Sequence, residues 1–95
     1  MKYFDWDELK NAQLKAERGV SFEDVYIAHE DNRIIDDRTH PNKKRYPNQR
    51  LLYVVINNYV YLVPYVETEN KIFLKTIIPS RKATRDYLKK PRKGE

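Results

Sequence analysis

The strongest constraint on the fold lies in residues 51–66, where two apolar runs are separated by only two residues. The runs 51–56 and 59–66 are rich in leucine, valine, isoleucine and tyrosine, which suits β-strands. Asn57-Asn58 suits a tight turn, because asparagine tolerates the positive φ that such turns require. The sequence therefore predicts a β-hairpin. Pro64 predicts an edge position or a bulge in the second strand, since proline has no N–H for the ladder.

Two helices are predicted ahead of this hairpin. Asp5 or Asp7 caps the first helix, and Gly19 ends it as a left-handed residue after Arg18. Ser21, with an aspartate three residues later, caps a second helix over about residues 22–30. The spacing places His29 on the apolar face of that helix, where we expect a partly buried, hydrogen-bonded side chain.

The other predicted elements are shorter. They are a strand at 33–36, a long basic loop at 37–49, a strand at 72–78 and a helix at 81–88. The order predicts an α+β fold, in which the helical hairpin packs on a mainly antiparallel four-stranded sheet with a short C-terminal helix. Because 95 residues are too few for a second core, we expect one domain over 1–90 and a basic tail at 91–95.

Charge is distributed unevenly along the chain. Residues 1–37 have a net charge of −5, whereas 38–50 and 81–95 have +5 each and 51–80 are neutral overall. Two basic blocks and an acidic front predict one surface that faces a polyanion. The alternative is an ordinary solvated surface with a loose basic tail.

Composition excludes several classes of site. The chain has no cysteine, so it has no disulfide, no thiolate zinc site and no cysteine nucleophile. The sequence has no apolar run of about 18 residues and no apolar N-terminal stretch, so we expect a cytoplasmic protein without a membrane partner. Asp36-Asp37 is an isolated pair of carboxylates among basic neighbours, and we therefore expect no metal and no cofactor.

Six segments, in order along nearly the whole chain, carry a family resemblance. They are Phe4-Asp5-Trp6-Asp7, Lys10-Asn11, Gly19-Val20-Ser21-Phe22-Glu23, Asp36-Asp37-Arg38-Thr39-His40, Arg50 and Ile77-Ile78-Pro79-Ser80-Arg81-Lys82-Ala83-Thr84. Together they resemble the BrnT-type toxins of type II toxin–antitoxin systems. The chain departs from the family pattern at 41–48, where a basic loop replaces an acidic, glycine-containing stretch, and in the tyrosine-rich segment 53–65.

The resemblance implies a compact fold related to RelE-type ribonucleases. It implies an endoribonuclease that cleaves RNA and arrests translation, and a cognate antitoxin of ribbon-helix-helix type that reaches operator DNA. Two alternatives stay open: a non-catalytic module that binds RNA or protein, and a toxin on the same scaffold that poisons a protein target such as gyrase.

Metal-independent RNA cleavage needs groups that move protons and groups that stabilise charge on phosphorus. His40 is the candidate acid or base, and Arg50 and Arg81 are the candidate phosphate ligands, because arginine donates bidentate hydrogen bonds. The predicted RNA-binding residues are Lys43, Lys44, Arg45, Lys75, Lys82 and Tyr61. Tyr59, Tyr61 and Tyr65 share one strand face, and packing in the sheet is the favoured interpretation of that stripe over base stacking.

Overall fold

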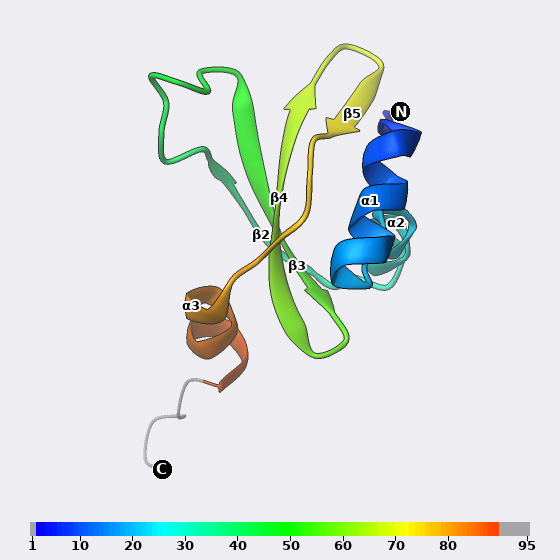
Figure 1. The fold of residues 1–95 in the computed structure, drawn as a ribbon. Helices are drawn as coiled ribbons and strands as arrows, with labels where there is room; N and C mark the ends of the chain where they lie inside the picture. The colour runs from blue at the N-terminus through cyan, green and yellow to red at the C-terminus, as the bar shows by residue number, and fades with distance from the viewer. Residues whose placement is uncertain (1, 90–95) are drawn as a thin grey trace.

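The computed structural model describes residues 2–89, which form a twisted sheet with helices on both sides (Figure 1). The strands are β1 (Tyr3–Asp5), β2 (Ile34–Thr39), β3 (Gln49–Ile56), β4 (Tyr59–Glu67), β5 (Lys71–Leu74) and β6 (Ile78–Pro79). The helices are α1 (Glu8–Arg18), α2 (Phe22–Glu30), α3 (Arg81–Thr84) and the π-helical turn η1 (Arg85–Lys89). The predicted α+β class is confirmed.

The sheet differs from the predicted four antiparallel strands. Its strand order is β1-β5-β4-β3-β2, and β6 also pairs with β4. β1 runs parallel to β5, which makes the sheet mixed, whereas the other pairs are antiparallel. The sequence does not indicate β1, because three residues are too few for a periodic pattern and their partner strand is distant in the chain.

Capping sets the limits of the two N-terminal helices. The Asp7 carboxylate accepts hydrogen bonds from the backbone N–H of Leu9 at 2.8 Å and of Lys10, so Asp7 rather than Asp5 is the N-cap. Gly19 ends α1 with φ of 69°, as predicted. The predicted cap at Ser21 is also confirmed, and both hydrogen bonds of the capping box are present.

A buried asparagine joins the two helices. Asn11 is 1% exposed, and its Oδ1 accepts a hydrogen bond from the backbone N–H of Phe22 at 2.8 Å. Its Nδ2 donates to Glu23 Oε1 at 2.8 Å. The hydrogen bond from Asn11 also lowers the pKa of the Glu23 carboxyl. This one side chain therefore fixes the start of α2 against α1.

The hydrophobic core lies between these helices and one face of the sheet. Alternate residues of β3 point into it, as the period of a strand requires. On the other face, α3 packs against β4, and the Thr84 hydroxyl accepts a hydrogen bond from Val60 N at 2.9 Å. The buried core residues are Leu14, Val20, Phe22, Val25, Ala28, Leu52, Val54, Ile56, Val63, Tyr65, Leu74 and Ile77.

Pro64 interrupts the pairing of β4 with the strand that follows it. β4 lies inside the sheet, not at its edge, and the predicted strand at 72–78 is divided into β5 and β6. The Pro64 carbonyl accepts a hydrogen bond from Lys75 N at 2.8 Å. The Pro64 nitrogen, which has no hydrogen to donate, therefore also faces the chain that follows β5. Arg18 donates to the Ile77 carbonyl at 2.6 Å and so holds the chain between β5 and β6.

β2 continues three residues beyond the predicted strand, through Thr39. The basic loop is therefore 40–48 and not 37–49. The sequence suggests a loop at 37–39 because these residues are charged or polar, but each pairs with a residue of β3. The predicted hairpin turn is confirmed, with φ of 53° at Asn57 and 62° at Asn58.

The remaining expectations concern His29, the C-terminal tail and membrane-spanning helices. His29 is not partly buried: its side chain is 53% exposed, and its ring centroid lies 5.1 Å from that of Phe4. The predicted basic tail at 91–95 lies outside the described residues. Among residues 2–89, no helix has the length and apolar character needed to cross a membrane.

Candidate phosphate-binding site at the base of the basic loop

Asp36 and Asp37 project from opposite faces of the sheet. Asp36 pairs with Tyr53 and Asp37 pairs with Leu52 across β2 and β3. Because directly paired residues lie on the same face, Asp37 is on the side of α1 and α2, and Asp36 is on the side of α3. These adjacent carboxylates therefore belong to two different clusters.

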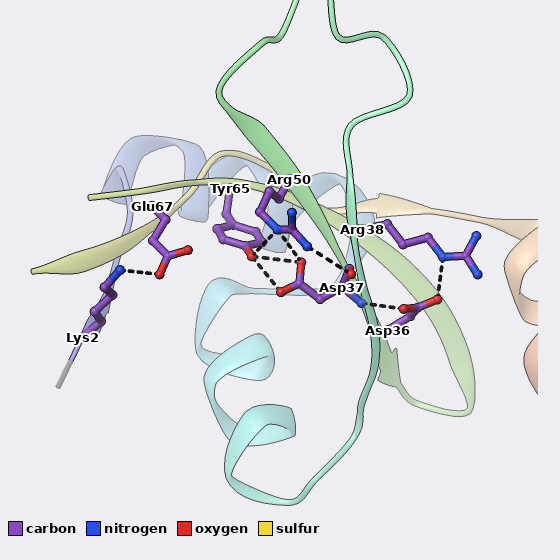
Figure 2. A network of polar contacts seen from close by, with 7 residues as sticks. All are labelled: Lys2, Asp36, Asp37, Arg38, Arg50, Tyr65 and Glu67. Carbon is purple, nitrogen blue, oxygen red and sulfur yellow. Dashed lines mark hydrogen bonds and ion pairs between the residues drawn. The ribbon is translucent and has the colours of Figure 1, made fainter. Parts of the chain in front are cut away.

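On the α1–α2 side, Asp37 is bound by Arg50 and Tyr65 (Figure 2). Arg50 Nε lies 3.1 Å from Asp37 Oδ1 and 3.2 Å from the Tyr65 hydroxyl. The Tyr65 hydroxyl lies 2.9 Å from each carboxylate oxygen of Asp37. Arg50 Nη2 also donates to the Asp37 backbone carbonyl. The three side chains therefore form one closed hydrogen-bonded cluster, which we call the Asp37 cluster.

The environment of the Asp37 cluster changes its acid–base behaviour. Burial, followed by the hydrogen bond to Asp37, raises the pKa of Tyr65 to about 12. The Tyr65 phenol and the Asp37 carboxylate raise the pKa of the Arg50 guanidinium. Tyr65 therefore stays neutral near pH 7 and Arg50 stays charged. The Arg50 and Asp37 side chains are 40% and 45% exposed, so a ligand in solution can reach both.

The basic loop starts at His40, directly beyond β2. The His40 backbone N–H donates to the Gln49 carbonyl at 3.2 Å, which places the His40 backbone beside Gln49, the residue that precedes Arg50. Its ring centroid lies 4.6 Å from that of Tyr46. Its Nδ1 accepts a hydrogen bond from Asn42 N at 3.1 Å. The neutral imidazole therefore carries its proton on Nε2, which is a donor for a ligand.

The rest of the loop is folded into turns that expose its cations. Asn42 accepts a hydrogen bond from Arg45 N through its side chain and one from Tyr46 N through its carbonyl. The Arg45 guanidinium lies 5.5 Å from the centre of the Tyr46 ring. Lys43, Lys44 and Arg45 are all exposed. The loop therefore presents three cations next to the His40–Tyr46 ring pair.

A second cluster, on the α3 side, contains Asp36, Arg38 and Tyr87, none of which is a candidate site residue from the sequence. Asp36 Oδ2 accepts hydrogen bonds of 2.6 Å from Arg38 Nε and from the Tyr87 hydroxyl. Arg38 Nη2 also contacts the Tyr87 hydroxyl at 3.0 Å, and the guanidinium lies 5.5 Å from the centre of the Tyr53 ring. The hydrogen bond from Tyr87 and the contact with Arg38 lower the pKa of Asp36. Alternation along β2 is the only signal in the sequence for this arrangement.

The structure does not bring Arg81 to His40 and Arg50. Arg81 opens α3, and the preceding Ser80 N–H donates to the Val60 carbonyl at the start of β4. That position is next to the hairpin turn, at the end of β3 and β4 that is remote from the basic loop (Figure 1). Arg50 and Arg81 therefore do not converge on one phosphate.

The other predicted RNA-binding residues are also dispersed. Lys82 is 80% exposed and lies 3.7 Å from Asp86. The Lys75 ammonium, between β5 and β6, lies 5.4 Å from the centre of the Phe73 ring. Tyr61 packs against the hydrophobic core, and Tyr65 is 3% exposed, which favours packing as the role of the tyrosine stripe. Of the predicted RNA-binding residues, Lys43, Lys44 and Arg45 belong to the loop that begins at His40.

The carboxylates do not form a cluster suited to a metal. Asp36 and Asp37 lie on opposite faces, and each is ion-paired with an arginine. Within residues 2–89, no group of three or more histidine, cysteine, aspartate or glutamate side chains is placed to hold a metal ion. The groups at this site that can donate to an anion are therefore the Arg50 guanidinium and the loop cations.

Comparison with known proteins gives no further assignment. No family model, curated protein or solved structure matches the chain.

Proposed function

We propose that this protein is a cytoplasmic endoribonuclease of the BrnT toxin type, which binds single-stranded RNA at the basic loop 40–48 and cleaves it without a metal. The observation that carries the proposal is the Asp37 cluster at the base of the basic loop, which begins at His40. The cluster supplies a carboxylate and an oriented guanidinium, and the loop supplies an imidazole N–H and three exposed cations. The segments that resemble BrnT-type toxins support the same assignment.

Arg50 and His40 supply the charge stabilisation in this proposal. Asp37 and Tyr65 hold the Arg50 guanidinium in one orientation, and its remaining N–H groups donate to non-bridging phosphate oxygens. His40 Nε2–H donates to the same phosphate or to the leaving 5′-oxygen. Donors that are fixed before the substrate binds stabilise charge as it develops in the transition state.

Asp37 is the proposed base. Its carboxylate takes the proton from the ribose 2′-hydroxyl, the 2′-oxygen attacks phosphorus, and the bond from phosphorus to the 5′-oxygen breaks. The leaving oxygen takes a proton from water. The products of this route are a 2′,3′-cyclic phosphate and a 5′-hydroxyl.

RNA binding is assigned to the loop cations. Lys43, Lys44 and Arg45 contact the phosphate backbone, and Tyr46 is the aromatic surface nearest to His40. The partner in this proposal is an antitoxin of ribbon-helix-helix type, which covers the loop with acidic or apolar residues and carries the complex to operator DNA. Arg81, Lys75 and Lys82 fall outside this site, so the proposal does not give them a catalytic role.

A cleavage assay with purified protein tests the proposal. His40→Ala, Arg50→Ala and Asp37→Asn should each lower the rate of RNA cleavage by at least about 100-fold, the scale for loss of a general base or a charge-stabilising donor. Lys15→Ala, a surface variant on α1 that removes one positive charge as Arg50→Ala does, is the control and should retain wild-type activity. Cleavage that is unchanged in all three variants would contradict the assignment of the site.

Binding without cleavage would favour the second candidate, a non-catalytic RNA-binding module. The specific observation for this candidate concerns His40, the imidazole of the loop. Its Nδ1 accepts the hydrogen bond from Asn42 and its Nε2 carries the proton, so neither ring nitrogen is free to accept a proton from a substrate. The salt dependence of RNA affinity tests the binding step alone. A triple variant in which Lys43, Lys44 and Arg45 are all alanine should have a smaller slope of log K against log salt. The slope should fall by about 2, because each phosphate contact to a single strand contributes about 0.7.

A further inference from the structure

The α3 side of the sheet has a cavity that the proposed cleavage site does not use. Its volume is about 410 Å³, which lies within the range of about 300 to 1,000 Å³ that small-ligand pockets occupy. It lies on the opposite face of the sheet from the Asp37 cluster, because Arg38 and Tyr53 alternate with Asp37 and Leu52 along their strands. The lining residues are Arg38, Tyr53, Leu62, Ser80, Lys82, Ala83, Asp86 and Tyr87.

The lining combines aromatic surface with cations. The Tyr53 and Tyr87 rings meet edge to face with centroids 5.6 Å apart, and Tyr87 is 39% exposed. Leu62 and Ala83 add apolar surface. Arg38 and Lys82 bring two positive charges to the cavity. A flat ring and an anion in one ligand match this combination, because bases stack on tyrosine and arginine planes and phosphates bind cations.

The carboxylates near the cavity are already paired with cations. Asp36 is bound by Arg38 and Tyr87, and Asp86 lies 3.7 Å from Lys82 and 3.4 Å from Arg85. The contacts of Arg38 within the described chain use Nε and Nη2. The guanidinium therefore still has donors at Nη1, and Asp36 holds it at the cavity wall.

The Arg38 wall of the cavity lies toward the basic loop, whereas its α3 wall lies toward the hairpin turn between β3 and β4. Arg38 precedes His40 by two residues, which is about 7 Å along an extended chain. β2 is an edge strand, so a polymer that lies on the loop can pass over this edge from one face of the sheet to the other. The two sites can therefore bind neighbouring parts of one strand.

We propose that this cavity binds one nucleotide, with the base against Tyr87 and Tyr53 and the phosphate at Lys82 and Arg38. The ligand is a nucleotide either within an RNA strand or free in solution. This inference extends the proposed function, because it adds a base-binding subsite to the RNA path. A free nucleotide can occupy the cavity even if the protein does not cleave RNA.

The test is a titration of the full-length ¹⁵N-labelled protein with adenosine 5′-monophosphate, followed by amide chemical shifts. We expect saturable changes at residues that line the cavity, including Arg38, Tyr53, Leu62 and Ala83. Tyr87→Ala should weaken binding at least about fivefold, as expected for loss of one stacking contact. Tyr87→Phe keeps the ring and should weaken it less.

Further variants separate the phosphate from the base. Lys82→Ala removes a highly exposed side chain and should weaken binding of the monophosphate about threefold, while binding of adenosine is unchanged. Lys15→Ala is the charge-matched control. Absence of shifts at the cavity up to about 10 mM nucleotide, or shifts that cluster elsewhere, would overturn the proposal.

A single-stranded oligoadenylate distinguishes the two sources of the ligand. If RNA is the ligand, the oligonucleotide should bind more tightly than the monophosphate and lose affinity in the triple variant of Lys43, Lys44 and Arg45. If a free nucleotide is the ligand, the affinities should be equal and the triple variant should have no effect. Cavity binding by a protein that cleaves no RNA would refute the cleavage proposal alone. RNA cleavage without cavity binding would refute the nucleotide site alone.

Discussion

Tyr65→Phe should change how the stability of the protein depends on pH. Tyr65 is 3% exposed, and its hydroxyl hydrogen-bonds with Asp37 at 2.9 Å and with Arg50 at 3.2 Å. The variant keeps the ring in the core and removes these contacts. At about pH 7 it should therefore unfold more easily than the wild type, by about 1 to 3 kcal/mol, the cost of losing hydrogen bonds to charged groups.

The difference should shrink in alkaline solution. The pKa of Tyr65 is raised from 10.0 to about 12 in the folded protein, so the unfolded state loses this proton first. A raised folded pKa gives stability that is complete below the unfolded pKa and disappears as pH rises through the folded pKa. The loss from Tyr65 should be about 1.4 kcal/mol at about pH 11, and should approach about 2.7 kcal/mol well above pH 12.

Urea unfolding of both proteins between about pH 7 and pH 11 measures this effect. Comparison with Tyr65→Phe cancels the contributions of the other tyrosines and the lysines, which are the same in both chains. We expect the difference in free energy of unfolding to fall by about 1.4 kcal/mol over this range. A difference that is independent of pH would show that burial and the hydrogen bond to Asp37 do not raise the pKa of Tyr65 as described.

Three further substitutions test the fold. Asn11→Ala should lower the free energy of unfolding by about 2 to 3 kcal/mol, because it leaves the N–H of the fully buried Phe22 without its acceptor. Thermal unfolding measures this, and a loss of stability smaller than that of the control Lys15→Ala would contradict it. Gly19→Ala should lower the free energy of unfolding by about 1 kcal/mol, because the φ of +69° is strained for alanine although the added Cβ meets no atom within 4 Å. Unchanged stability in denaturant unfolding would refute this. Thr84→Val should lower the free energy of unfolding by about 1 to 3 kcal/mol and increase hydrogen exchange in α3, because it removes the hydroxyl that bonds Val60 and Ser80. Thr84→Ser keeps the hydroxyl and should do neither. Equal exchange in both variants would show that this hydroxyl does not hold α3 against β4.

Local signals in the sequence predicted the helices and the central hairpin. Gly19, Ser21 and the Asn57-Asn58 turn act through their own backbone or that of residues three positions away, so their effects can be inferred without the rest of the fold. β1 could not be predicted, because Tyr3–Asp5 becomes a strand only by pairing with residues 71–73. The extension of β2 was missed for a similar reason: its polar residues pair with β3.

The candidate site was predicted only in part. His40 and the loop cations belong to one loop because they are close in the chain, and Arg50 lies at the base of that loop because it pairs with Thr39. Tyr65 was considered as a member of a stripe, but its contact with Asp37 depends on the order of β2, β3 and β4. Arg81 is far from the loop because β6 and α3 follow β4 to its other end. Long-range strand order, which periodicity does not encode, decides these cases.

The product ends of RNA cleavage test the central claim most directly. Purified protein is incubated with a single-stranded RNA in the presence of a metal chelator, and the same sequence as DNA serves as the matched control. The proposal predicts that the RNA is cut to fragments with 2′,3′-cyclic phosphate and 5′-hydroxyl ends, whereas the DNA remains intact because it lacks the 2′-hydroxyl. RNA that remains intact with equimolar protein, or DNA that is cut equally well, would contradict the proposal.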